Sequence, residues 1–314
     1  MTPLALIDAH HHLWDLSRLA YPWLQGEGDP GFFLGDYQAL RRNYLPEDLR
    51  HDAREFRLLA SVHCEAEHER SQPVRETQWL TALHARSSLP TALVAWAPLT
   101  DQAVAEPLLE VHAQSPLLRG IRCKPVTAKG AAQRDAVKGT PGSLQDPAWH
   151  HGLRLLQRHG LSWDLRVPWW HLEEAAQLLE SFPDLPVILN HTGLPWDRSP
   201  EGLAGWHRGM QALARLPRVA VKVSEFGLPA PGWRVDENRR IVRETLALFG
   251  HDRCMFASNF PVAGLRIGYG DLVRHMADFL AEDTPAQQEA FFQGTAQAYY
   301  RIELGGADKL PLAQ

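Results

Sequence analysis

The sequence predicts a single-domain α/β protein with eight parallel strands, each followed by helix, which is the (β/α)8 or TIM barrel class. Short apolar segments alternate with longer segments of helical spacing eight times along the 314 residues. Such alternation is typical of parallel strands joined by crossover helices. Polar side chains also follow strand after strand, at the end where a barrel of this class carries its active site. Eight such units in a chain of this length match a closed barrel better than an open sheet.

The predicted strands are short runs of apolar, often β-branched residues. They cover 4–7, 56–63, 91–97, 117–122, 161–167, 186–190, 218–223 and 253–257. The predicted helices carry apolar residues three and four positions apart, and the first has a proline in its first turn. They begin near 46 and then cover 73–88, 101–114, 148–159, 171–181, 200–215, 236–249, 271–281 and 286–299.

Two segments, about 13–52 and 123–147, lack a regular period. The first mixes aromatic residues with glycine and proline, and the second is rich in Lys, Gly, Ala and Thr. We expect both to form long loops that cover the site, because loops of this length inside a compact domain are usually functional. No domain boundary interrupts the pattern, so residues 1–314 are predicted to form one domain.

Composition excludes several classes of partner. The net charge is −5 and Lys and Arg do not cluster, which argues against nucleic acid. No apolar run approaches the roughly 20 residues that span a bilayer, and no secretory signal is visible. The three cysteines are odd in number and far apart, which predicts no disulfide framework and favours the cytoplasm. A homodimer is the default expectation for such a protein.

The first strand ends in the sequence Ile7-Asp8-Ala9-His10-His11-His12-Leu13-Trp14. Residues two apart in a strand share a face, so His10 and His12 are predicted to point the same way. Two imidazoles on one face could form half of a metal site. Asp8 has the same parity and is predicted to lie one step deeper on that face.

Further polar residues follow the other predicted strands. They are His63, Glu65, Glu67, Arg122, Lys124, Asp164, Arg166, His191, Lys222, Ser224, Glu225 and Asn259. Gathered at one mouth, they fit a site that binds an anionic or polar small molecule and activates water, with or without a metal. Some have structural interpretations as well: His63 as a core histidine, Arg166 as a structural residue, and Lys222 in a buried ion pair with Glu225 or Asp164. The sequence lacks the motifs of serine hydrolases and nucleotide-binding proteins.

Several segments carry a resemblance to a known family. Residues 7–15 and 21–24 resemble the start of the amidohydrolase-related proteins, in the branch that contains sugar-lactone and 2-pyrone-4,6-dicarboxylate lactonases. The likeness continues, in order, through 119–122, 190–193, 221–224 and 253–262.

The resemblance implies a barrel hydrolase that directs water at the carbonyl of a lactone or similar cyclic ester, with a carboxylated or polar lactone as substrate. It implies that His10 and His12 are the first-strand metal pair, with Zn²⁺ the first candidate. It implies that His191 acts on the carbonyl or as the base. It places Arg122 and Lys222 where a substrate carboxylate could bind.

The chain departs from the family pattern at two strand ends. Many members end the eighth strand in an aspartate that binds metal and accepts a proton, whereas this chain has Asn259. An amide cannot act as a general base. The predicted fifth strand carries Asp164, Leu165 and Arg166 where many metal-dependent relatives have a histidine. Both metal-assisted and metal-free hydrolysis therefore stay open.

If the chain is a lactone hydrolase, Asn259 is expected to position the water or the substrate. Glu65 and Glu225 are then substrate contacts or reserve bases. Two alternatives are a decarboxylase of aromatic or unsaturated acids on the same barrel, and a non-catalytic ligand-binding barrel.

Overall fold

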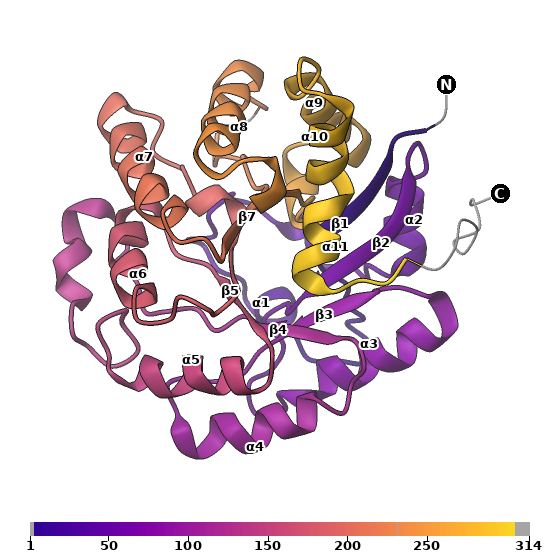
Figure 1. The fold of residues 1–314 in the computed structure, drawn as a ribbon. Helices are drawn as coiled ribbons and strands as arrows, with labels where there is room; N and C mark the ends of the chain where they lie inside the picture. Colours follow the sequence, from indigo (N-terminus) through magenta and orange to yellow (C-terminus); the bar gives the residue numbers. More distant parts are fainter. Residues whose placement is uncertain (1–2, 231, 305–314) are drawn as a thin grey trace.

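The computed structural model describes residues 3–230 and 232–304 and shows a barrel of eight parallel strands (Figure 1). The strands pair in chain order from β1 to β8, and each neighbouring pair is parallel. They are β1 (Ala5–His11), β2 (Arg57–Cys64), β3 (Ala92–Ala95), β4 (Leu118–Ile121), β5 (Ser162–Leu165), β6 (Val187–Leu189), β7 (Val219–Val223) and β8 (Cys254–Phe256). Beyond β8, the amide of Asn259 donates to the carbonyl of His10 at 2.7 Å, which brings the eighth strand back to the first. The predicted (β/α)8 barrel is confirmed.

Helices surround the strands, as Figure 1 shows. They are α1 (Pro22–Gln25), α2 (Pro46–Asp52), α3 (Val74–Ser87), α4 (Gln102–His112), α5 (Ala148–Arg158), α6 (Leu172–Leu179), α7 (Pro200–Ala214), α8 (Val235–Phe249), α9 (Tyr269–Phe279), α10 (Pro285–Glu289) and α11 (Thr295–Tyr300). Local sequence sets their starts: the Ser199 hydroxyl accepts from the Gly202 amide at 3.0 Å, and Pro200 occupies the first turn of α7. No described helix has the length and apolar character that a membrane crossing needs.

The apolar core has two parts. Large side chains fill the space between the strands and the outer helices, whereas mainly small ones fill the barrel interior. Tyr300 of α11 joins the interior group and is fully buried. Gln293, just before α11, donates to the carbonyl of Ala5 at the start of β1, at 3.0 Å. Helix α11 therefore packs against the end of the barrel at which the strands begin.

The prediction for Asp8 is wrong. The pairing of β1 with β2 shifts register between Asp8 and His11, which marks an irregularity of the β-bulge kind. Such an irregularity re-aims the side chains that follow it. Asp8 accepts from the Ser258 hydroxyl at 2.6 Å and from the phenol of Tyr269, the first residue of α9, at 3.2 Å. Asp8 therefore faces α9, whereas His10 faces the barrel interior.

Candidate functional site

A cavity of about 580 Å³ lies at the carboxyl ends of the strands. Its lining includes six polar side chains that follow strands: His12, Arg122, Lys124, Arg166, His191 and Asn259. The segment 13–52 adds aromatic residues, among them Trp23, Phe32, Phe33 and Tyr37. Trp23 and Phe32 stack with ring centroids 6.0 Å apart. The cavity thus combines a polar, mainly cationic floor with an aromatic wall.

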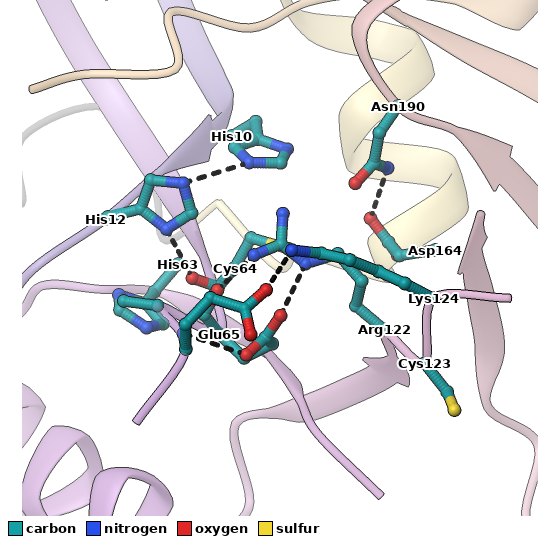
Figure 2. A network of polar contacts seen from close by, with 12 residues as sticks. His10, His12, His63, Cys64, Glu65, Arg122, Cys123, Lys124, Asp164 and Asn190 are labelled. Atoms are coloured by element: carbon teal, nitrogen blue, oxygen red, sulfur yellow. Dashed lines mark hydrogen bonds and ion pairs between the residues drawn. The ribbon is translucent and has the colours of Figure 1, made fainter. Parts of the chain in front are cut away.

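His10 and His12 lie together, as their spacing predicted (Figure 2). Their Nε2 atoms are 3.3 Å apart. The Nδ1 atom of His12 lies 2.7 Å from the carbonyl oxygen of Cys64, and because a carbonyl only accepts, His12 must donate from Nδ1. Burial, and next the charges of Lys222 near His10 and Arg122 near His12, lower the pKa of both imidazoles well below 6.5. Both rings are therefore neutral near pH 7.

Asn259 presents its amide oxygen to the same place. Its Oδ1 atom lies 3.2 Å from His12 Nε2, while its Nδ2 donates to the Glu225 carboxylate. Since His12 carries its proton on Nδ1, its Nε2 is an acceptor, and so is Asn259 Oδ1. Because His12 Nε2 cannot donate to it, Asn259 Oδ1 is available at the cavity to accept from an O–H donor. Asn259 adopts a left-handed backbone with φ of 55°, a strained conformation that is often found at functional sites.

His191 follows β6 and lines the cavity. Its backbone is also left-handed, with φ of 57°. Its Nδ1 atom lies 3.0 Å from the Ser224 hydroxyl, and its ring centroid lies 4.5 Å from that of His10. Burial, followed by the charges of Arg166 and Arg122, lowers the pKa of His191 well below 6.5. The imidazole is therefore neutral and can accept a proton.

Glu65 and Arg122 form a buried pair. The Arg122 Nε donates to Glu65 Oε1 at 2.8 Å (Figure 2). Arg70 donates to the other carboxylate oxygen at 3.0 Å. Although burial acts to raise the pKa of Glu65, Arg122 and Arg70 hold it well below its usual range. Arg122 lines the cavity and Glu65 lies behind it. Glu65 thus orients Arg122, and both of its carboxylate oxygens already accept hydrogen bonds.

Lys222 lies beneath the cavity and is completely buried. Its Nζ atom is 2.5 Å from Asp164 Oδ1 and 3.3 Å from His10 Nδ1. Asp164 also accepts from Asn190 Nδ2 at 3.0 Å and from the Tyr300 phenol at 3.0 Å. The ion pair that forms is therefore the one with Asp164, and Glu225 instead accepts from Asn259. His63 is buried too, and its Nδ1 accepts from the Leu13 amide at 3.0 Å.

Arg166 lines the cavity, where the sequence placed it among the residues at the mouth, although a structural role was also open. Its guanidinium lies 5.9 Å from the ring centroid of Phe33 and 5.8 Å from that of Trp196. Burial, and next the charge of Arg122, lower its pKa to about 10, so it stays charged. Arg122 and Lys124 both pair with glutamates. Within the described ranges, Arg166 has no such carboxylate partner. The two-residue spacing from Asp164 was a usable signal for its orientation.

Glu225 should make stability depend on pH. The side chain is 2% exposed, and burial raises its pKa to about 7 from an ordinary 4.5. Between these values the folded chain binds a proton that the unfolded chain has released, so stability falls as pH rises through this window. Glu225→Gln removes the effect. Relative to wild type, we expect the free energy of unfolding of the variant to rise by on the order of 3 kcal/mol between about pH 4.5 and pH 8.

Urea unfolding of both proteins at the two pH values measures this gain. The exposed residue Glu282 provides the matched control, Glu282→Gln, which should track wild type. A difference between Glu225→Gln and wild type that stays constant with pH would contradict the assignment.

The donor set around His10 and His12 does not fit a four-coordinate zinc ion. Among residues 3–230 and 232–304, no group of three or more His, Cys, Asp or Glu side chains is placed to hold a metal. The atoms nearest the pair are the Asn259 amide oxygen and, behind His10, the Lys222 ammonium. Metal-binding histidines normally donate from their second nitrogen to an acceptor. His10 meets a donor there instead.

Fold and site together define a (β/α)8 barrel that gathers neutral histidines, an amide and several cations around one cavity. The chain belongs to the amidohydrolase family, because the family model described as amidohydrolase matches residues 7–302. The resemblance seen in the motifs is thereby confirmed, and the chain is an enzyme of this hydrolase family.

Individual relatives span nearly the whole chain. An uncharacterized protein, y4mH, of Sinorhizobium fredii is 36% identical over 302 residues, covering 96% of this chain and 100% of its own length. An L-fucono-1,5-lactonase of Burkholderia multivorans is 28% identical, covering 94% of this chain and 96% of its own.

Solved structures agree with the fold. An amidohydrolase of Burkholderia multivorans with bound zinc has a TM-score of 0.77 at 25% identity, covering 95% of this chain and 100% of its own. A structure described as a 2-pyrone-4,6-dicarboxylic acid hydrolase of Pseudomonas putida has a TM-score of 0.68 at 18% identity, covering 96% of this chain and 99% of its own, and shows the same fold.

Proposed function

We propose that this enzyme hydrolyses a lactone or similar cyclic ester with an activated water. The observation that carries the proposal is the acceptor Asn259 Oδ1, which lies at the cavity 3.2 Å from His12 Nε2, an atom that cannot donate to it. Neutral His191 lines the same cavity. L-fucono-1,5-lactonases among the relatives support the choice of a lactone.

The reaction uses the chain's own residues. One O–H of the water donates to Asn259 Oδ1, and the other donates to His191. Because Nδ1 of His191 is engaged with Ser224, Nε2 takes the proton as the water oxygen bonds to the carbonyl carbon. The ring C–O bond then breaks, and His191 returns the proton to the departing ring oxygen. The product is an open-chain hydroxy acid.

Nearby cations stabilise the charge that develops during the attack. The carbonyl oxygen becomes an oxyanion, and the cations Arg122 and Lys124 line the cavity. Fixed charges in a partly dry site act strongly on such an intermediate. Arg122 is held in place by Glu65, so little reorganisation is needed. Glu65 and Lys222 therefore support the site from behind.

The substrate is proposed to carry a carboxylate or a similar anionic group. Arg166 supports this, because it faces the cavity between two aromatic rings and lacks a carboxylate partner among the described residues. Arg166→Gln should lower kcat/KM for a carboxylated lactone by about 10- to 100-fold, through KM, since hydrogen bonds to charged groups contribute about 1.5–3 kcal/mol. The matched neutral lactone, with hydroxymethyl in place of carboxylate, should lose little.

Proton release in weakly buffered solution measures both the proposed activity and this preference. Arg154→Gln, at an exposed position, is the control and should match wild type. Equal losses on both lactones would overturn the role of Arg166. Failure to open any lactone, together with carbon dioxide release from aromatic acids, would replace the hydrolase by the decarboxylase alternative.

A further inference from the structure

Lys222 reaches the histidine pair from below. Its ammonium lies 3.3 Å from His10 Nδ1 and is anchored by Asp164 at 2.5 Å. The ring of Tyr300 lies beneath it, 5.1 Å from Nζ to the centroid. Lys222 is wholly buried, and Asp164 is in turn held by Asn190 and Tyr300. The ammonium is thus fixed at His10 by a network of buried contacts.

This contact decides where His10 carries its proton. An ammonium has three N–H donors and no acceptor, so His10 Nδ1 must accept. A neutral imidazole has one N–H, which therefore lies on Nε2. That N–H points toward His12 Nε2 at 3.3 Å. From the other side, the carbonyl of Cys64 requires the His12 proton on Nδ1, which leaves His12 Nε2 to accept.

The Lys222 contact at one end and the Cys64 contact at the other therefore both require His10 Nε2 to donate to His12 Nε2. We propose that Lys222 is a positioning residue that locks His10 with its proton on Nε2. The His10–His12 pair then works as a donor and an acceptor, and not as two metal ligands. The inference concerns the pair itself and holds whatever ester the enzyme opens.

The lock should also oppose zinc. To bind an ion through Nε2, His10 would have to carry its proton on Nδ1, where it would face the Lys222 ammonium. Two donors would then oppose each other in a fully buried place, and Asp164 prevents the ammonium from moving aside. Groups that hydrogen-bond to metal-binding histidines commonly change metal affinity by about 10- to 100-fold. The partner of His10 is the Lys222 ammonium, a donor, so it should weaken zinc binding.

The direct test is long-range ¹H–¹⁵N correlation spectroscopy of the full chain labelled at histidine nitrogens, with signals assigned through His10→Asn and His12→Asn. In wild type we expect His10 protonated on Nε2 and His12 on Nδ1, with no change after one equivalent of zinc chloride. A His10 proton on Nδ1 in metal-free wild type would overturn the proposal.

Variants supply an independent readout in zinc binding measured by equilibrium dialysis. Lys222→Met should release His10 to the Nδ1-protonated form and raise zinc affinity by about tenfold or more. Lys138→Met, at an exposed lysine, should leave both the spectrum and the affinity unchanged. Should Lys222→Met fail to fold, Lys222→Met/Asp164→Asn removes both buried charges and replaces it. Unchanged tautomers and affinity in the folded variant would refute the lock.

Discussion

His191→Ala is expected to lower kcat/KM for lactone hydrolysis by about 10²- to 10⁴-fold, the usual contribution of a positioned acid–base group. The proposed mechanism gives His191 both proton transfers, from the water and to the ring oxygen. The ring lines the cavity, and its Nδ1 is held by the Ser224 hydroxyl. The loss should fall mainly on kcat, because the cations that bind the substrate are untouched.

Steady-state kinetics on the carboxylated lactone measures this effect, and circular dichroism with thermal unfolding verifies that the fold is kept. The exposed residue His51 gives the matched control, His51→Ala, which should retain wild-type kinetics. Near-normal turnover in a folded His191→Ala protein would remove His191 from the mechanism and direct attention to His12.

Asp164→Ala is expected to destabilise the protein by about 3–5 kcal/mol, the usual result of removing one partner of a buried ion pair. Three donors lose their acceptor in this variant: the Lys222 ammonium, the Asn190 amide and the Tyr300 phenol. The ammonium is fully buried and would be left without a counter-charge. An unpaired charge in such a place is much more costly than a missing contact at the surface.

Urea unfolding near neutral pH gives the free energy of unfolding of wild type and of Asp164→Ala. Asp278→Ala breaks the exposed pair with Arg239 and serves as the comparison, for which at most about 1 kcal/mol is expected. The double variant Lys222→Met/Asp164→Asn should recover much of the lost stability, because no unpaired charge stays in the barrel. A loss for Asp164→Ala no larger than that for Asp278→Ala would show that the buried pair is not a stabilising contact.

The fold was accessible from sequence because its signals are local. The strand predicted at 56–63 is β2 (Arg57–Cys64), and the helix predicted at 73–88 is α3 (Val74–Ser87). A parallel barrel repeats such units, so each one adds to the evidence for the same topology. The helix predicted at 286–299 is one helical run through α10 and α11, with a π-helical segment at Ala290–Gly294 between them.

The partners within the site were much less accessible. Strand counting places Asp164 and Lys222 at one end of the barrel, but it does not show which carboxylate the ammonium meets. The contact of His12 with Asn259 joins residues 247 apart in the chain. Asp8 was misplaced because a register shift within β1 leaves no mark in the alternation of residues. Arg166 was undervalued because Phe33 and Trp196, which hold it, come from loops without a readable period.

The contact between Tyr300 and Asp164 also has a consequence for biosynthesis. A nascent chain that has emerged only as far as α10 already contains every residue that lines the cavity. It still lacks the Tyr300 phenol that donates to Asp164. Asp164 in turn holds the Lys222 ammonium beneath the histidines. Translation must therefore pass α11 before the chemistry can be set. Truncations and gene fusions of this enzyme should therefore keep α11.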